Sequence, residues 1–202
     1  RIAFIGIGFC LFVFIYTSFT VGLARCVLYK NFELDKIHPY IYVEKSMPSQ
    51  DRQRLFNIYQ KSIQRIETFF GEQKARPYLL VGNTDFIIKN YGNQNAQVGL
   101  THLSPLTTYI VIDSAGLNID VISHELCHAE LRERVGWYGR EFKIPTWFDE
   151  GLAMLVDKRF PEWEVDWAMM TDHGKTAPDL NTLKTAKQFF EGENAYINYI
   201  SA

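Results

Sequence analysis

His124-Glu125-Leu126-Cys127-His128 is the stretch around which the rest of this sequence can be interpreted, because its spacing follows from a specific chemistry. Residues four apart lie on the same face of an α-helix, so His124 and His128 can bind one metal ion together. Glu125 stands beside the first histidine, where its carboxylate can reach a metal-bound water rather than the metal. The HExxH spacing therefore predicts a helix that carries two metal ligands and a general base.

The segments around this motif predict an α+β fold, because strands come first and helices follow. Strand character, from alternating or β-rich residues, is found in Pro39–Val43, Pro77–Val81 and Tyr109–Ile112. Helical spacing or helix start signals are found in Ser49–Phe70, Phe86–Asn90, Leu117–Arg134, Pro145–Asp157, Asp179–Phe190 and Ala195–Ile200. We therefore expect a mixed sheet, the HExxH helix and a helical C-terminal part.

A catalytic zinc site needs a third protein ligand, because zinc prefers four ligands and keeps one position for water. A metzincin would have glycine and histidine where this chain has Leu131 and Arg134, so that class is excluded. The better candidate is Glu150 in the apolar segment PTWFDEGLA, where a carboxylate is an awkward core residue unless something pairs it. The alternative is that Asp149 and Glu150 are acids at a helix N-terminus, favoured by the helix dipole.

HELCH followed by WFDEGLA resembles the gluzincin zinc metallopeptidases, in particular their aminopeptidase-like and peptidase MA-like branches. The resemblance covers about residues 108–201 and implies a zincin-like metallopeptidase domain. It implies that Glu150 is the third metal ligand, and that Gly151 and Ala153 let their helix approach the HExxH helix closely. The GxMEN-like signature of the aminopeptidase branch is absent from the sequence, so specificity for a free amino terminus does not follow.

The resemblance also implies a mechanism of zinc hydrolysis. A zinc-activated water attacks the peptide bond, and Glu125 acts as the general base. In the resembling enzymes a tyrosine in a later helix stabilises the developing oxyanion. Tyr196 is the closest match to that tyrosine, with Tyr199 and His173 as alternatives, and core packing is the other interpretation of both tyrosines.

Three further interpretations concern residues near the motifs. Asp149 and Asp157 are both candidates for orienting a ligating imidazole from behind, and the sequence leaves both open. Cys127 stands at a motif position where a small apolar thiol packs into the core, so we expect a structural role. The strand Tyr109–Ile112 resembles the sheet-edge strand with which zincins bind extended peptide by backbone pairing.

The charge balance argues against nucleic acid as a partner. The chain has 21 Lys and Arg against 23 Asp and Glu, a formal charge of −2. Three of the cations, Arg1, Arg25 and Lys30, precede residue 31, where no acid occurs, so the remainder of the chain is more acidic than the total. An acidic domain without a basic run does not attract phosphate backbones.

The N-terminal segment predicts a membrane anchor. The residues between Arg1 and Arg25 carry no charge and are rich in Ile, Phe, Val and Leu, and about 20 such residues cross a bilayer. We therefore expect a transmembrane helix, or alternatively a cleaved signal segment, in residues 1–30 and a catalytic domain in residues 31–202. A lone N-terminal span favours an extracytoplasmic domain, although Arg25 and Lys30 favour the opposite orientation.

Together these patterns predict a membrane-anchored zinc metallopeptidase that acts on peptides or proteins, and they leave the oligomeric state open. One alternative is a non-catalytic zincin-like domain that serves as a membrane-tethered sensor or assembly factor. Glu125 argues against it, because metal binding alone needs no base there. A zincin scaffold with a different hydrolytic substrate is the second alternative. Because the sequence begins with Arg1 and ends at Ala202 within a predicted helix, we expect it to be a fragment.

Overall fold

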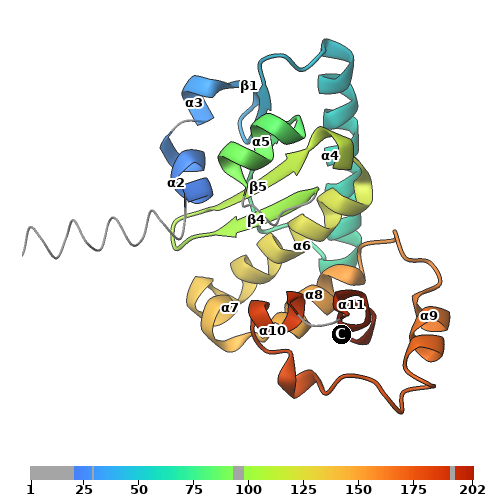
Figure 1. Ribbon diagram of the computed structural model, residues 1–202. Helices are drawn as coiled ribbons and strands as arrows, with labels where there is room; N and C mark the ends of the chain where they lie inside the picture. Colours follow the sequence, from blue (N-terminus) through green and yellow to red (C-terminus); the bar gives the residue numbers. More distant parts are fainter. Residues whose placement is uncertain (1–20, 29, 93–97, 192–193) are drawn as a thin grey trace, which may run out of the picture. The chain divides into compact units, whose positions relative to one another are not determined.

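The computed structural model describes residues 21–28, 30–92, 98–191 and 194–202 (Figure 1). Within them the chain forms two compact units, which we describe separately. The first unit comprises Arg1–Arg52, Tyr78–His102 and Tyr109–Gly116, as far as these are described. The second comprises Gln53–Pro77, Leu103–Thr108 and Leu117–Ala202.

The first unit is built on a mixed five-stranded sheet with the order β1-β2-β3-β5-β4. The strands are β1 (Leu34–His38), β2 (Ile41–Glu44), β3 (Tyr78–Gly82), β4 (Gly99–Leu103) and β5 (Thr108–Asp113). β1 pairs antiparallel with β2, whereas β2, β3 and β5 run parallel. The predicted α+β class is confirmed, and the three predicted strands correspond to β2, β3 and β5. Their aliphatic residues are buried on both faces of the sheet, as is usual for parallel strands.

The predicted position of Tyr109–Ile112 at the sheet edge is wrong. These residues belong to β5, which lies between β3 and β4 and is buried along its whole length. Leu79 and Ile110 are partners in the parallel pairing of β3 with β5. A continuous run of aliphatic residues is typical of such an interior parallel strand, whereas an edge strand is usually marked by polar or charged residues.

The described residues of the first unit also form the helices α2 (Val21–Leu28), α3 (Lys30–Glu33) and α5 (Thr84–Tyr91) and the short 3-10 helix Ser114–Gly116. α2 packs closely on the end of α5, since a Cβ added at Gly22 would lie 2.3 Å from the carbonyl oxygen of Gly92. Leu23 and Cys26 of α2 are buried in the same hydrophobic cluster as Tyr109 of the sheet. This packing makes α2 part of the core of the unit.

The predicted transmembrane helix is not found among the described residues, where no helix is both long and apolar enough to cross a membrane. The described end of the predicted span, Val21–Ala24, belongs to the eight-residue helix α2, in which Leu23 and Cys26 are buried against other parts of the same unit. Residues 1–20 lie outside the described part of the chain. The prediction of a membrane-anchored, extracytoplasmic protein is corrected accordingly, and the division into residues 1–30 and 31–202 stays a prediction.

The second unit is helical. It contains α4 (Ser49–Phe70) from Gln53 onward, α6 (Ile119–Val135), α7 (Trp137–Lys143), α8 (Thr146–Met154), α9 (Trp163–Met170), α10 (Ala186–Phe190) and α11 (Ala195–Ser201). The helices predicted at Ser49–Phe70 and Leu117–Arg134 correspond to α4 and α6. α7 and α9 were not predicted, and neither buries a residue, so they lack the apolar stripe on which helix prediction depends.

The ends of α6 and α8 follow from their sequences. The Asn118 side chain accepts a hydrogen bond from the Val121 N–H and caps the start of α6. Gly136, with φ of +76°, ends it. Pro145 stands just before the first residue of α8, in an extended conformation that its fixed φ allows. At this position its missing N–H removes no hydrogen bond from the helix.

α8 packs against both α6 and α11 within the second unit (Figure 1). Ala153 is fully buried, as expected for a small residue at a close helix contact. The nearest atoms that a Cβ at Gly151 would meet belong to Ala202, at 2.6 Å. A side chain at Gly151 would therefore first meet the residue after α11. The resemblance implied that Gly151 lets α8 approach the HExxH helix closely; α8 does pack against α6, but the role of Gly151 in that contact stays a prediction.

Candidate metal centre

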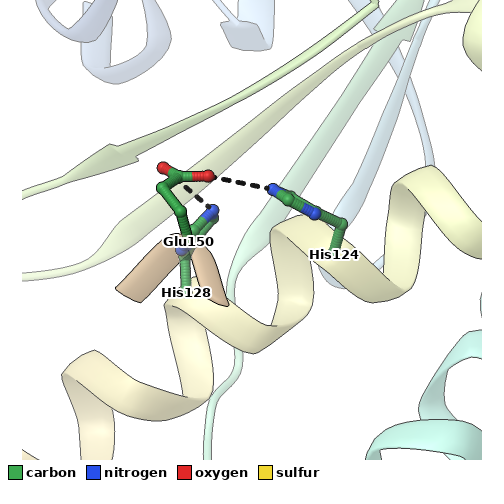
Figure 2. A group of neighbouring side chains, drawn as sticks. All are labelled: His124, His128 and Glu150. Carbon is green, nitrogen blue, oxygen red and sulfur yellow. Dashed lines mark ion pairs between the residues drawn. The ribbon is translucent and has the colours of Figure 1, made fainter. Parts of the chain in front are cut away.

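The structure brings together the three metal ligands predicted from the sequence. His124 and His128 lie one turn apart on α6, and Glu150 faces them from α8 (Figure 2). His124 Nε2 is 3.4 Å from one Glu150 oxygen, and His128 Nε2 is 3.8 Å from the other. One ligand atom from each residue lies within 4.8 Å of the others, and all three side chains are buried. This group could bind a metal ion.

His128 is held from behind by Asp149, the residue that precedes Glu150 in α8. The His128 Nδ1 atom lies 2.8 Å from Asp149 Oδ1, and the contact is buried. Arg140 of α7 donates a hydrogen bond from Nη2 to the other Asp149 oxygen. A carboxylate behind the ring favours a proton on Nδ1, which leaves the Nε2 lone pair free for a metal.

His124 has a similar partner in Asp157, which follows α8. The His124 Nδ1 atom lies 3.3 Å from Asp157 Oδ2, close enough for an ion pair but not aligned as a hydrogen bond. The Asp157 carboxylate is fully buried and receives hydrogen bonds from Nε and Nη2 of Arg159, at 2.5 to 2.9 Å. Both aspartates that the sequence left open therefore face an imidazole.

The electrostatics of the centre favour a cation between the imidazoles. Burial lowers the pKa of His124, but Asp157 and Glu150 outweigh that effect and raise it to about 10. The pKa of His128 is likewise lowered by burial and raised more strongly by Asp149 and Glu150. The carboxylates around the two imidazoles therefore favour a positive charge at this position.

The formal charge of the cluster matches a divalent metal ion. Two imidazoles, four carboxylates and two guanidiniums belong to it: His124, His128, Glu125, Glu150, Asp149, Asp157, Arg140 and Arg159. With neutral imidazoles and ionised carboxylates the cluster carries a charge of −2, which a divalent cation would cancel. The donor set of two imidazoles and one carboxylate suits such an ion and leaves a coordination position open.

The predicted general base lies in the same buried stretch of α6. Glu125 is 8% exposed, and its charge contributes to the raised pKa of the neighbouring His124. Its charge also raises the pKa of Tyr199. Glu125 therefore lies within electrostatic range of one ligand and of a tyrosine from a separate helix.

Of the two tyrosines on α11, Tyr199 is the one beside the ligands. Burial raises the pKa of Tyr199, as do the charges of Glu150 and Glu125 and a hydrogen bond with Glu150. The Tyr196 hydroxyl instead donates to Asp166 at 2.5 Å, and that bond is the main cause of its raised pKa. The predicted catalytic role of Tyr196 stays a prediction, and the contacts favour Tyr199, the alternative that the sequence left open.

His173 and Cys127 do not join the ligand group found among the described residues. His173 is exposed in a turn after α9, with φ of +56°, and its backbone N–H donates to Ala168 O. Cys127 is 1% exposed, and burial raises the pKa of its thiol, as expected for a core residue. Its predicted structural role is confirmed.

Sequence reasoning missed the two arginines behind the aspartates. Arg159 stands two residues after Asp157, and this spacing was the one signal that could have indicated the pair. Arg140 lies in α7, a helix that the sequence did not predict, so no pattern connected it with Asp149. The pairing of Arg140 with Asp149 depends on how α7 is placed relative to α8, whereas that of Arg159 with Asp157 is local in the sequence.

Comparisons with models of protein families, with curated proteins and with solved structures found no match to this chain. The resemblance of HELCH and WFDEGLA to gluzincins therefore stays a prediction, and function is inferred from the geometry of the metal centre.

Proposed function

We propose that the protein is a zinc-dependent hydrolase that cleaves peptide bonds. The observation that carries this proposal is the gathering of His124, His128 and Glu150 beside Glu125, in a buried centre with a formal charge that suits a divalent ion. Two imidazoles and one carboxylate with an open position form a catalytic zinc site in many hydrolases, and the same donor set also binds iron(II).

Each of the three ligands would offer one atom to the zinc ion. The Nε2 atoms of His124 and His128 and a carboxylate oxygen of Glu150 are the converging donors. When bound, zinc supplies a Lewis acid that polarises a carbonyl group and makes water acidic near neutral pH. Asp149 and Asp157 keep the imidazole protons on the Nδ1 atoms, away from the ligand positions.

Glu125 would transfer the proton. A carboxylate next to a ligand but outside the ligand group can accept a proton from the attacking water and return it to the leaving amine. Tyr199 would act as a hydrogen-bond donor to the developing oxyanion, because its raised pKa keeps the hydroxyl protonated. Peptide is the proposed substrate because HELCH and WFDEGLA resemble metallopeptidase motifs.

The test compares Glu125→Gln with the unchanged protein. We expect the variant to retain one zinc ion per chain, measured by elemental analysis, because Glu125 is not a ligand. We expect cleavage of a fluorogenic peptide library to fall by about 100- to 10,000-fold, the usual contribution of a general base. A chelator should abolish cleavage by the unchanged protein, and added zinc should restore it.

Glu133→Gln is the matched control, because Glu133 also lies on α6 but its side chain is 44% exposed and contacts Arg132. We expect this control to cleave peptides at the original rate. Equal cleavage by Glu125→Gln and the unchanged protein would contradict the proposed mechanism. Full zinc content without cleavage of any peptide would favour the non-catalytic alternative, and cleavage of esters alone would favour a different hydrolytic substrate.

A further inference from the structure

The segment that carries Asp157 is anchored on both of its sides. On one side, Arg65 Nη1 donates a hydrogen bond of 2.9 Å to the carbonyl oxygen of Val156. On the other side, the Lys158 N–H donates one of 3.2 Å to Asp120 Oδ1. Asp157 therefore lies between a carbonyl group held by Arg65 and an N–H group held by Asp120.

The two anchoring side chains are themselves paired. Arg65 Nη1 lies 2.5 Å from Asp120 Oδ1, the same oxygen that accepts from Lys158. Ser62, one turn before Arg65 on α4, is buried, and its hydroxyl lies within hydrogen-bond distance of Ile58 O, at 3.0 Å, and of Ile119 O at the start of α6, at 3.2 Å. The anchor thus joins α4, the first turn of α6 and the segment after α8, all within the second unit.

Asp157 depends on these anchors more than Asp149 does. Asp149 lies inside α8, where the helix fixes its backbone. Asp157 lies beyond the last residue of α8, and its own N–H bonds to Ala153 O and Met154 O complete only the final turn. Its direction toward His124 is thus determined by what holds the neighbouring residues.

We propose that Arg65 and Asp120 are positioning residues for the metal centre, which act through Asp157 on the imidazole of His124. This inference rests on the proposed metal site. Among the described residues, the side-chain hydrogen bonds of Arg65 and Asp120 join them to each other, to the carbonyl oxygen of Val156 and to the Lys158 N–H, rather than to a proposed ligand.

The expected effect follows from the imidazole that Asp157 faces. If the segment shifts, the His124 Nδ1 atom loses the carboxylate 3.3 Å away, and the ring loses its preferred orientation and tautomer. Removing the partner of a metal-ligating histidine usually lowers metal affinity by about 10- to 100-fold. An effect transmitted through Asp157 cannot exceed the effect of removing Asp157 itself.

The test is a double-mutant cycle on zinc affinity, measured by competition with a chromophoric chelator. We expect Arg65→Met and Asp157→Ala each to weaken zinc binding on the order of 10-fold. The double variant should bind zinc no more weakly than Asp157→Ala alone, because both changes remove the same support. Unchanged affinity in Arg65→Met, or losses that multiply in the double variant, would overturn the inference.

Arg134→Met is the matched control for a purely structural arginine. Arg134 pairs with Glu130 and donates to the carbonyl oxygens of Phe70 and Glu72, so it also ties α6 to the α4 region. We expect this variant to lower the free energy of unfolding while zinc affinity stays within about twofold, since none of these contacts reaches a residue that supports a ligand. An equal loss of zinc affinity in the control would overturn the inference.

Asp120→Asn serves as the second variant, because asparagine keeps the acceptor oxygen but loses the ion pair with Arg65. We expect a smaller loss of zinc affinity than in Arg65→Met. In a protein that already carries Asp157→Ala, Asp120→Asn should cause no further loss. Zinc affinity is measured without substrate, so this test does not depend on peptide cleavage. If the unchanged protein binds zinc but cleaves no peptide, the proposed function is overturned, and the double-mutant cycle still decides whether Arg65 and Asp120 act through Asp157. An unchanged protein that binds no zinc would overturn both.

Discussion

The two histidines of the metal centre are held in different ways. Asp149, behind His128, lies in the same helix as the ligand Glu150, so ligand and support are fixed by one set of helical hydrogen bonds. Asp157, behind His124, lies after that helix at a longer distance and depends on Arg65 and its partner. Each histidine is therefore supported by an aspartate, but Asp149 is positioned by its own helix and Asp157 by contacts with other helices. We expect His128 to be held more rigidly than His124.

The largest effect is expected from the ligand that joins the two sides. Glu150 faces both imidazoles, one with each oxygen, so Glu150→Gln should leave only two good ligands. We expect zinc to be lost on dialysis against a mild chelator, with elemental analysis as the measurement. Glu141→Gln is the control, because that side chain is 42% exposed and contacts Arg140 rather than an imidazole. Retention of a full equivalent of zinc by Glu150→Gln would show that the ligand set is wrong.

The next effect compares the two supports directly. We expect Asp149→Ala to weaken zinc affinity by about 100-fold and Asp157→Ala by about 10-fold, the two ends of the usual range. The difference is expected because the Asp149 contact is a 2.8 Å hydrogen bond, whereas the Asp157 contact is 3.3 Å and not aligned. Chelator competition measures both. A larger loss at Asp157 would reverse the comparison and make His124 the more dependent ligand.

The pH dependence of the zinc-free protein should also separate the two sides. The pKa of His124 is raised from 6.5 to about 10, because Asp157 and Glu150 outweigh burial. A raised histidine pKa stabilises the fold fully below pH 6.5, and this contribution is lost as the pH rises through about 10. The free energy of unfolding, measured with urea, should therefore fall over this range. Asp157→Asn should flatten the fall, and an unchanged slope would contradict the role of Asp157.

The acid side of the same profile reports on Asp149. Burial raises its pKa, but His128 and Arg140 outweigh burial and lower it from 3.8 to about 2. A lowered carboxyl pKa stabilises the fold above pH 3.8, and this contribution is lost as the pH falls through about 2. Asp149→Asn should therefore remove part of the acid dependence, and an acid limb identical to that of the unchanged protein would contradict it.

The sequence predicted which three residues come together at the candidate metal centre, because each of them stands out in a local pattern. His124 and His128 come together through helical spacing alone, and Glu150 stood out as a carboxylate in an apolar helix. The choice between Tyr196 and Tyr199 was different. They are three residues apart on α11, and their contacts differ, with Asp166 for one and Glu150 for the other. That difference depends on how α11 packs, which no local pattern records.

The two wrong predictions have a common physical cause. An apolar run satisfies a bilayer and a protein core equally well, so the uncharged residues between Arg1 and Arg25 indicate a membrane span, although the structure buries Leu23 in the first unit. The aliphatic run Tyr109–Ile112 resembles an edge strand of the zincins, whereas its burial on both faces is that of an interior strand. In both cases the apolar composition indicated that the segment is buried, but not which part of the protein, or which lipid, buries it. The strand β1 went unpredicted for the opposite reason, since Asp35 and Lys36 interrupt its apolar pattern.

The smallest effect is expected from exchanging the arginines behind the aspartates for lysine. Arg140 reaches Asp149 through one nitrogen, Nη2, so a single lysine ammonium can replace that contact. Arg159 contacts both oxygens of Asp157 through Nε and Nη2, a forked geometry that lysine lacks. We expect Arg140→Lys to change zinc affinity by less than about twofold and Arg159→Lys to weaken it about threefold to fivefold, below the loss from removing the aspartate itself. Equal losses at both positions, measured by chelator competition, would mean that charge alone orients the aspartates. In that case the difference between the two sides would come from the backbone anchors rather than from the arginines.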